Sequence, residues 1–380
     1  MKIAYLSFGE SPHDVRFLSK MVEWGHNPFL ISYYGKNLVS IEGVHILKFD
    51  YQNLYKTSQF VSSLCQYQFA KKILAFQIGQ HLKKLLKKLN VDILHTNFIQ
   101  YEGFCGALSG FHPVVSVPWG SDILINPRLS KLDRLITKYT LKKADKIVCD
   151  CEIMKNTILK LTGLSKDAVD VFPFGINLKV FYPSQEARRT TREKLNWQDK
   201  KILLMNRNFK EVYGIEYFIK ALPYIIKKFP DTKVILLGGG PDKDKYVRMI
   251  MELKLSDVVF LPGFVNEKEM ARYLNAADVY ISIPSSDGTS VSLLEAMACR
   301  LPVVVSDLLA NREWVEDGVN GFIVPIQNSR ALTNAISNLF ADEKTRKDFA
   351  DKNLRIARER ADWDKNYEKL DIIYRKLVRS

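Results

Sequence analysis

The sequence predicts an α/β protein made of two doubly wound, mostly parallel sheets, and three observations lead there. Short apolar segments alternate with amphipathic helical segments from end to end, which is typical of parallel strands joined by helical crossovers. At 380 residues the chain exceeds the size of one ordinary core and suits two domains. A stretch at 169–183 that mixes Pro, Gly and aromatic residues separates the apolar segments into two series, as a linker would.

The two series give the expected strands in order. The first series predicts strands at 3–7, 27–32, 44–48, 93–95, 114–117 and 146–149. The second predicts strands at 202–206, 233–238, 258–261, 279–283, 303–306 and 321–324. A final helix at 363–378 carries one apolar stripe, which needs a surface to cover.

Composition places the protein among ordinary folded chains, with 47% hydrophobic and 26% charged residues. The cysteines are odd in number, are scattered and form no CxxC pair, which favours reduced thiols in a cytoplasm over a zinc site: Cys65, Cys105, Cys149, Cys151 and Cys299. No stretch approaches the length of a membrane-spanning helix. We therefore expect a cytoplasmic protein.

The net charge of +14 indicates a negatively charged partner, and nucleic acid, anionic lipid and phosphorylated substrates are all candidates. No zinc finger, RNA-binding signature or helix-turn-helix accompanies the charge, so we expect no specific nucleic acid. An amphipathic helix at 71–89 carries Lys83, Lys84, Lys87 and Lys88 on one face, with Lys71 and Lys72 upstream. This face is either simply solvated or attached to the inner, anionic face of the cytoplasmic membrane, where each basic residue adds about 1 kcal/mol.

The segment 284–305, PSSDGTSVSLLEAMACRLPVVV, carries the strongest functional signal. A small polar loop with Asp287 leads into a helix that carries Glu295, and the first-turn amides of Thr289, Ser290 and Val291 suit a diphosphate. A carboxylate in the same place suits the hydroxyls of a sugar or ribose. The other interpretation is an ordinary crossover, since Ser292 and Glu295 have the spacing of a capping box.

This segment and its surroundings resemble the retaining glycosyltransferases of family four, which are glycosyl transferases group 1 with the GT-B fold. That family carries Glu-x7-Glu, then EAMACGxPVV and a later nGxxv segment. Here Asp287 and Glu295 are followed by EAMACRLPVVVSD and by NREWVEDGVNGFIVP. Asp287 shortens the reach of the first carboxylate. Arg300 replaces the usual helix-end glycine, at a cost of about 1 kcal/mol in left-handed backbone.

The resemblance implies a domain organisation and a reaction. It implies two Rossmann-like domains facing a cleft, with residues 1–178 for the acceptor, 179–360 for the nucleotide-sugar donor and 361–380 as a helix returning to the first domain. Four residues match the family's linker: Gly175, Asn177, Phe181 and Pro183. The implied reaction is hexosyl transfer to a glycan, lipid-linked or other small acceptor, as in polysaccharide biosynthesis. It would proceed with retention of anomeric configuration and without a cofactor or protein-bound metal.

On the donor side, the expected groups follow strand ends of the second series. Arg207 is placed to fork onto the diphosphate. Lys210 is the nearest substitute for a family lysine and is either a phosphate contact or a solvated loop charge. Gly263 and Phe264 resemble the turn that reads the nucleobase, or form a plain hydrophobic turn. Gly238–Gly239–Gly240 match no phosphate-loop motif and are explained as well by a tight turn.

On the acceptor side, the loop after the first strand offers Gly9, Glu10 and His13, of which His13 is a general base or a cap neighbour. Trp119 stands where many family members have a histidine that bonds the transferred sugar. Asp122 holds a loop backbone or contacts a substrate hydroxyl. A strand-end histidine such as His95 is more often packed than catalytic.

Two other functions remain open at this stage. A GT-B nucleotide-sugar epimerase would consume the donor without an acceptor. A basic, non-catalytic scaffold that binds nucleic acid or membrane would not need Arg207 and Glu295. A dehydrogenase is disfavoured because no GxGxxG follows the first strand.

Overall fold

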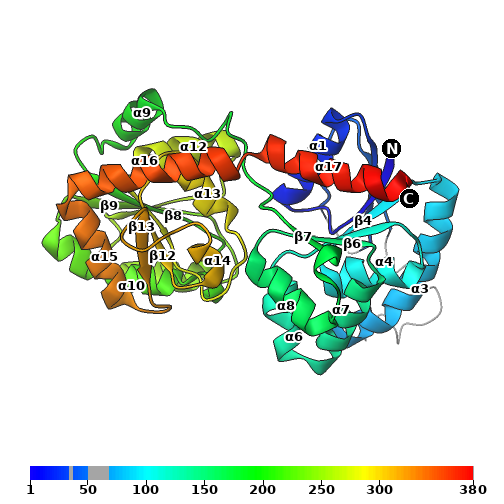
Figure 1. Ribbon diagram of the computed structural model, residues 1–380. Coiled ribbons are helices and arrows are strands. Elements are labelled where there is room, and N and C mark those ends of the chain that lie inside the picture. Colours follow the sequence, from blue (N-terminus) through cyan, green and yellow to red (C-terminus); the bar gives the residue numbers. More distant parts are fainter. Residues whose placement is uncertain (34–36, 50–67, 380) are drawn as a thin grey trace. The chain divides into compact units, whose positions relative to one another are not determined.

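The computed structural model describes residues 1–33, 37–49 and 68–379. Cys65 lies outside this range, and the side chains of Lys71 and Lys72 are not described either. The chain divides into two compact units, Met1–Phe172 with Tyr367–Ser380, and Pro173–Asn366 (Figure 1). The sequence placed its domain boundaries after 178 and after 360.

The first unit contains a seven-stranded parallel sheet in the order β3-β2-β1-β4-β5-β6-β7. Its strands are β1 (Lys2–Leu6), β2 (Asn27–Ser32), β3 (His45–Lys48), β4 (Ile93–Asn97), β5 (Val114–Val117), β6 (Lys146–Cys149) and β7 (Val169–Val171). The central strands β1, β4 and β5 are buried along nearly their whole length, as strands of a parallel sheet covered on both faces are, although β4 ends in the polar residues His95, Thr96 and Asn97. The residues of β7 were assigned to the linker, which is wrong: although only three residues long, this segment pairs with β6.

Helices cover both faces of this sheet. The helices are α1 (Pro12–Glu23), α3 (Gln68–Leu89), α4 (Phe104–Ser109), α5 (Ser121–Leu124), α6 (Asn126–Leu129), α7 (Lys131–Lys143), α8 (Glu152–Thr162) and α17 (Trp363–Arg379), with a π-helix at Ile99–Gly103 and a 3-10 turn at Lys166–Ala168. Ser11 starts α1 with a capping box that Asp14 completes. On the opposite face, α3, α4, α7 and α8 pack side by side as one layer (Figure 1).

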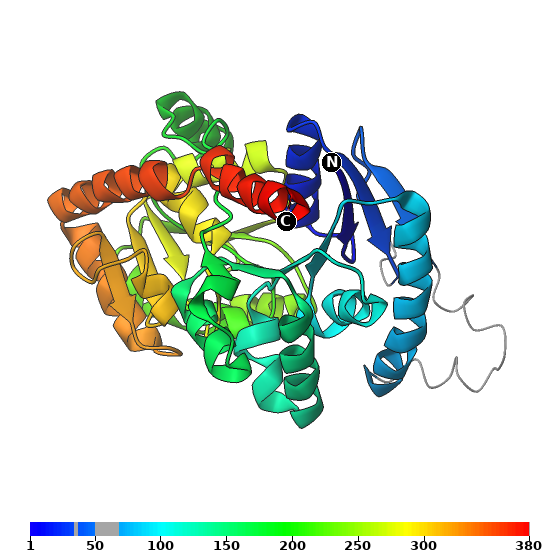
Figure 2. The same ribbon diagram turned by 45° about the vertical axis from the view of Figure 1, so that its right-hand side comes forward.

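The last helix, α17, lies along α1 (Figure 1, Figure 2). Its Tyr367 packs against Phe17 of α1, and Asp371 Oδ1 lies 2.7 Å from Nε2 of His26. Both partners are buried, so the apolar stripe expected for this helix covers the α1 face of the first sheet.

The second unit contains a six-stranded parallel sheet in the order β10-β9-β8-β11-β12-β13. Its strands are β8 (Lys201–Asn206), β9 (Thr232–Leu237), β10 (Val259–Gly263), β11 (Val279–Ser282), β12 (Val303–Ser306) and β13 (Gly321–Val324). One face packs on α10 (Ile215–Lys228), α11 (Lys243–Glu252) and α15 (Ser329–Ala341). The other packs on α12 (Glu267–Ala276), α13 (Val291–Ala298) and α16 (Glu343–Arg360).

Three short helices complete this unit: α9 (Gln185–Leu195), α14 (Leu309–Arg312) and a 3-10 turn at Glu211–Tyr213. Two positions have left-handed backbone that restricts the residue choice, and of these only Arg300 was predicted to have it. Arg300 follows α13 with φ +61, the left-handed conformation expected there. Gly175 has φ +80, and a Cβ on it would lie 2.7 Å from the carbonyl oxygen of Ala361, so only glycine fits where the chain returns past the linker.

Candidate active site

The centre of the second sheet is the point where strand order reverses. β8 lies between β9 and β11, so the chain winds outward in opposite directions from β8 and β11. Ligands of open α/β sheets bind outside the carboxyl ends of the strands at such a switch point. Arg207 follows β8 directly and the Asp287 loop follows β11, so adjacent strands bring these two sequence-distant segments together.

Arg207 is held by three side chains of that loop. Its Nη2 donates to Asp287 Oδ2 at 2.6 Å, and its Nη1 donates to Oγ of Ser290 at 2.5 Å and of Ser292 at 3.1 Å. The guanidinium also lies over the ring of Tyr213, 4.1 Å from its centre. Burial, the largest single effect, acts to lower the pKa of Arg207. The Asp287 carboxylate, together with Tyr280 and Tyr213, more than offsets it and raises that pKa above its usual value, so the arginine stays charged. The sequence did not anticipate that Arg207 and Asp287 form an ion pair.

Helix α13 begins at a different cap from the one that the capping-box interpretation requires. Its N-cap is Ser290, whose Oγ accepts from the amide of Leu293, so the residue three positions on is a leucine. The Ser292–Glu295 capping box is therefore wrong. Glu295 lies in the second turn and is only 7% exposed.

The buried phenol of Tyr280 lies close enough to Arg207, Asp287 and Glu295 to feel the charge of all three. Burial raises the pKa of Tyr280, Arg207 acts to lower it, and the carboxylates of Glu295 and Asp287 act to raise it. Two further polar atoms at the ends of β8 and β11, Asn206 Oδ1 and Ser282 Oγ, are buried without a hydrogen-bond partner in the described part of the chain. Unsatisfied buried polar atoms are rare in folded proteins, and here they adjoin the expected ligand position.

The triple glycine supports the loop that carries Arg207. A Cβ on Gly238 would lie 2.3 Å from the carbonyl oxygen of Arg207, and one on Gly240 would lie 2.7 Å from that of Phe209. The amide of Phe209 in turn donates to the Gly239 carbonyl at 2.8 Å. Glycines are therefore required because the loops after β8 and β9 touch backbone to backbone.

The remaining donor-side residues lie at the same edge of the sheet. Gly263 is the last residue of β10, with φ +81, rather than part of a turn beyond it. Phe264 is 75% exposed, so the hydrophobic-turn interpretation leaves its ring without cover. Lys210 precedes the Glu211–Tyr213 turn and is exposed.

In the first unit, the loop after β1 is held by hydrogen bonds to residues that follow β2. Gly9 accepts from the amide of Val39 at 2.7 Å, and Glu10 Oε1 accepts from the amide of Asn37 at 2.8 Å. Gly9 has φ +75, and a Cβ there would lie 3.0 Å from Leu38 Cδ2. These residues shape the loop that the sequence assigned to the acceptor.

Trp119 is the centre of an aromatic cluster at the carboxyl edge of the first sheet. Its ring stacks on Phe98 with centres 5.6 Å apart and meets the ring of His13 edge-on at 4.5 Å. Its Nε1 donates to Asn97 Oδ1 at 2.8 Å. Burial, with a smaller effect of Arg16, lowers the pKa of His13 to about 3, so this histidine is neutral near pH 7.

Asp122 holds the turn that presents Trp119. Its two carboxylate oxygens accept from the amides of Ile99 at 3.1 Å and Trp119 at 2.9 Å. Burial nonetheless raises the pKa of Asp122 to about 6. The structure therefore shows the backbone-holding role for Asp122.

His95 is packed, as expected, and it links the site to the end of the chain. Its Nδ1 lies 2.6 Å from the hydroxyl of Tyr374 and its Nε2 lies 3.2 Å from Asn97 Oδ1. Since Asn97 Oδ1 can only accept, Nε2 carries the proton and Tyr374 donates to Nδ1. Burial lowers the pKa of His95 to about 3. Sequence reasoning missed Asn97, although its position at the end of β4, before the aromatic segment 98–101, was a usable signal.

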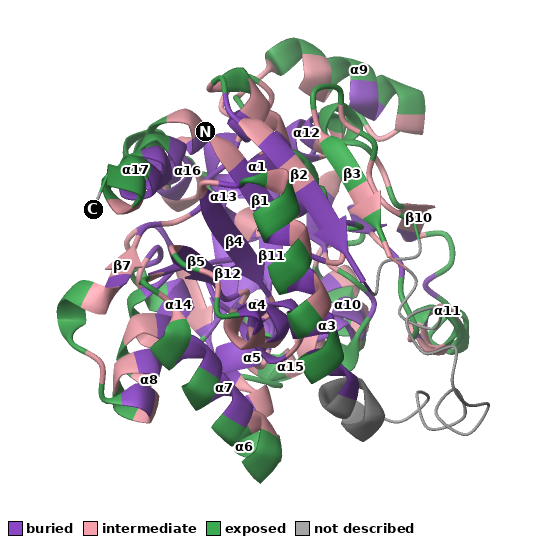
Figure 3. Ribbon diagram, turned by 90° about the vertical axis from the view of Figure 1, so that its right-hand side faces the viewer, coloured by how far each residue is buried: buried purple, intermediate pink, exposed green. Residues whose placement is uncertain are grey.

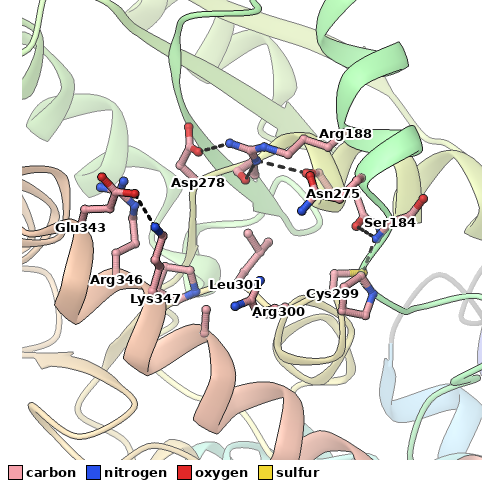
Figure 4. A pocket seen from close by; sticks show the side chains of 15 residues that line it. Ser184, Arg188, Asn275, Asp278, Cys299, Arg300, Leu301, Glu343, Arg346 and Lys347 are labelled. Atoms are coloured by element: carbon pink, nitrogen blue, oxygen red, sulfur yellow. Dashed lines mark hydrogen bonds and ion pairs between the residues drawn. The ribbon is translucent and has the colours of Figure 1, made fainter.

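A cavity of about 250 Å³ elsewhere in the second unit holds none of the predicted site residues (Figure 4). Its lining includes residues that precede β11 and β12, at the amino edge of the sheet. There Asp278 binds Arg188 at 2.6 Å, and it also pairs with Arg192 at 2.7 Å. These charges are mutually satisfied, which favours a structural role.

Comparison with known proteins gives two family matches. The model for glycosyl transferases group 1 matches residues 187–355, and the model for glycosyl transferase 4-like proteins matches residues 2–151. A curated relative, N-acetyl-alpha-D-glucosaminyl L-malate synthase of Bacillus anthracis, is 21% identical over 334 residues, which cover 87% of this chain and 86% of the relative.

Two solved structures share the fold. Anabaena HepE in complex with UDP-glucose superposes with a TM-score of 0.80 at 19% identity, over 99% of this chain and 100% of that one. Sucrose-phosphate synthase from Thermosynechococcus elongatus gives 0.82 at 19% identity, over 99% of both chains. Together with the family matches to both halves, these likenesses confirm the resemblance that the Asp287–Pro325 motifs indicated. The chain therefore belongs to the group 1 glycosyltransferases and has the GT-B fold.

Proposed function

We propose that this protein transfers a sugar from a nucleotide diphosphate sugar to a glycan, lipid-linked or other small acceptor, with retention of anomeric configuration. The observation that carries the proposal is the convergence of Arg207, the start of α13 and Glu295 at the switch point between β8 and β11. The UDP-glucose bound by HepE supports a donor of this class.

The diphosphate would bind between Arg207 and the start of α13. Three of the five N–H groups of Arg207 are engaged by the Asp287 loop, which leaves two donors without a partner in the described part of the chain. The backbone amides of Thr289, Ser290 and Val291 lie just before and at the start of α13, where the positive end of the helix dipole adds to their attraction for an anion. Such fixed donors would stabilise the charge that develops on the departing diphosphate, a contribution of about 3–4 kcal/mol for each strong donor.

The other donor-side roles follow from position. Glu295 would hold the ribose hydroxyls, Asp287 would lie near the transferred sugar, and Gly263 with exposed Phe264 would receive the base. No covalent nucleophile is assigned, because Asp287 is already paired with Arg207. The proposed reaction needs no protein-bound metal, so a chelator should leave its rate unchanged.

For the acceptor we propose the loop and aromatic cluster of the first unit: Gly9, Glu10, His13, Trp119 and Asp122. Flat aromatic faces suit sugar rings, carboxylates suit sugar hydroxyls, and the pKa of His13, lowered to about 3 by burial, keeps that ring uncharged. We place the enzyme in the cytoplasm at the inner face of the membrane, with the exposed Lys83, Lys84, Lys87 and Lys88 of α3 facing anionic lipid. Among the described residues, no helix combines the length and the apolar character needed to span a bilayer.

The test is a panel of nucleotide diphosphate sugars. Each is first screened for protection of the protein against thermal unfolding, and protective donors are then incubated with and without carbohydrate acceptors under mass spectrometry. Product that forms only with an acceptor, with its anomeric configuration read by NMR, supports the proposal. A changed sugar nucleotide without acceptor would identify an epimerase instead, and absence of binding by every nucleoside diphosphate would reject the donor site.

A further inference from the structure

One outer face of α6 and α7 combines exposed apolar and basic residues that the sugar-transfer site does not use. Leu129 is 79% exposed and Leu135 is 65% exposed, and Leu132 and Tyr139 are exposed as well. Within α7, residues 132, 135 and 139 follow i, i+3, i+7 spacing and so share a side of the helix. We call this set, Leu129, Leu132, Leu135 and Tyr139, the leucine face.

Basic residues frame the leucine face. The segment 126–143 carries one acidic residue, Asp133, and six basic residues: Arg128, Lys131, Arg134, Lys138, Lys142 and Lys143. All six are exposed, and within the described residues none of them lies within ion-pair distance of a carboxylate. Some exposed cations of other helices are paired along their helix, as with Arg189 and Glu193 at 2.9 Å or Lys220 and Glu216 at 2.6 Å.

Packing does not account for these leucines, because α7 already has a buried side. That side consists of Ile136, Thr137, Thr140 and Leu141, which face the rest of the first unit. A helix with a second, exposed apolar side marks an interaction surface more often than a fold requirement.

We infer that the leucine face docks this protein on an anionic lipid bilayer. Leucine and tyrosine side chains would enter the boundary between headgroups and acyl chains, while the long basic side chains reach anionic headgroups along their own apolar stems. A second copy is disfavoured, since two-fold pairing would bring six cations against six like charges. Nucleic acid would use the cations but leave the leucines without a partner.

The lysine face of α3 plays a secondary part in this arrangement. Helices α3, α4 and α7 belong to one layer of the first unit, and their exposed stretches are green in Figure 3. Among the described side chains of α3, Phe76 is the only large apolar one that is exposed. We therefore assign insertion to the leucine face, and only longer-range attraction to the α3 lysines.

The test is co-sedimentation of the full chain with vesicles of phosphatidylglycerol and phosphatidylcholine in equal parts, compared with pure phosphatidylcholine. The wild type should bind the anionic vesicles at low salt. The Leu129→Ser/Leu135→Ser variant should bind at least about tenfold more weakly, because it loses the inserted side chains. An Arg134→Gln/Lys138→Gln variant should lose the preference for phosphatidylglycerol.

Two controls make the result specific. Ile372→Ser/Val378→Ser removes exposed apolar residues from α17, on the other side of the same sheet, and should bind as the wild type does. The four-lysine variant K83Q/K84Q/K87Q/K88Q should lose only a few-fold, with that loss disappearing in high salt. Thermal unfolding curves check that each variant is folded.

Three outcomes would overturn the inference. Wild-type binding by Leu129→Ser/Leu135→Ser would show that the leucines do not enter lipid. Absence of vesicle binding by the wild type, with light scattering that shows a dimer lost in this variant, would assign the face to self-association. Retention of DNA without vesicles would assign the cations to nucleic acid. Sugar transfer to a water-soluble acceptor is measured separately and should be equal in all variants, so failure of the sugar-transfer proposal leaves this test intact.

Discussion

The carboxyl edges of the two sheets have the same architecture but opposite electrostatic character. In the second unit that edge holds fixed charges, with Arg207 kept ionised by Asp287. In the first unit, burial lowers the pKa of both His13 and His95 to about 3 and raises that of Asp122 to about 6. Each of these shifts favours the neutral form of the group. One Rossmann-like edge is thus suited to an anion and the other to uncharged rings and hydroxyls.

Burial alone does not produce this difference, because ionisable groups are buried on both sides. Arg207 has a carboxylate 2.6 Å away, which offsets the desolvation of its charge. The partners of His95 are a phenol and an amide, which satisfy the neutral ring and leave desolvation unopposed. The choice of one neighbouring side chain therefore decides whether a buried group keeps its charge.

The largest expected effect is that of Glu295→Ala in the charged edge. Turnover should fall by roughly 10³-fold or more, because the carboxylate proposed for the ribose is gone. Alanine favours helix, so α13 and the far-ultraviolet spectrum should be preserved. Steady-state kinetics with the donor found in the panel provide the measurement, and normal turnover would remove Glu295 from the site.

Arg207→Lys should lower kcat/KM by about 10²-fold, since an ammonium cannot fork over the Asp287 loop and the diphosphate together. Arg188→Lys is the matched control, because Arg188 pairs with Asp278 at 2.6 Å at the other edge of the sheet. It should cost stability without changing donor affinity. Equal losses of donor affinity in both variants would mean that Arg207 acts through stability.

Gly238→Ala should lower the free energy of unfolding by about 2–3 kcal/mol, from a clash added to left-handed backbone. The new Cβ would meet the Arg207 carbonyl oxygen at 2.3 Å, with φ at +118. Gly318→Ala separates the steric clash from the backbone strain, because Gly318 has φ +73 but a Cβ there would meet nothing within 4 Å. This substitution should cost only about 1 kcal/mol. Denaturant unfolding measures both, and similar losses would show that the contact between the loops is unimportant.

At the carboxyl edge of the first sheet, the pH dependence of stability tests the same contrast. The folded-state pKa of His95 is depressed from 6.5 to about 3, so its contribution to stability is present above pH 6.5 and is lost as pH falls toward 3. The slope reaches about 1.4 kcal/mol per pH unit. The stability difference between wild type and His95→Gln should therefore narrow as pH falls through this window.

The contribution of Asp122 to stability should depend on pH in the opposite direction. Its folded-state pKa is raised from 3.8 to about 6, so its contribution is present below pH 3.8 and is lost as pH rises toward 6. Asp122→Asn should remove this component while leaving the histidine component in place. Parallel pH curves for the two variants would contradict the assigned burial effects.

The smallest effect is expected for Lys210→Ala. An exposed side chain should leave stability within about 0.5 kcal/mol, while the donor KM should rise several-fold if the ammonium helps to hold the diphosphate. An unchanged KM would leave Lys210 a solvated loop charge.

The fold was largely readable from the sequence because its strands are short apolar runs bounded by helices. β7 escaped since three residues, one of them Asp170, give too little pattern, and only pairing with β6 defines the strand. The left-handed backbone at Arg300 was predictable because related sequences have a glycine at this helix end, and glycine marks backbone that other residues rarely adopt.

The site was predictable in its members but not in their mutual contacts. The sequence placed both Arg207 and Asp287 after strands of the second series, yet their ion pair depends on strand order and side-chain geometry that spacing does not fix. Ser292 had the right spacing for a cap, but the extended backbone of Ser290, at φ −73 and ψ 108, decides where α13 begins. The hydrogen bond between His95 and Tyr374 spans 279 positions, beyond any local pattern.

That last link affects how the polypeptide matures as it leaves the ribosome. The core of the first unit buries His26 and His95 against Asp371 and Tyr374, which lie 345 and 279 positions further along the chain. Their polar atoms stay incompletely satisfied until α17 has been synthesised, so the first unit is completed only after the whole second unit has been made. A nascent chain stalled before α17 should thus be a better substrate for chaperones and proteases than its length alone would suggest.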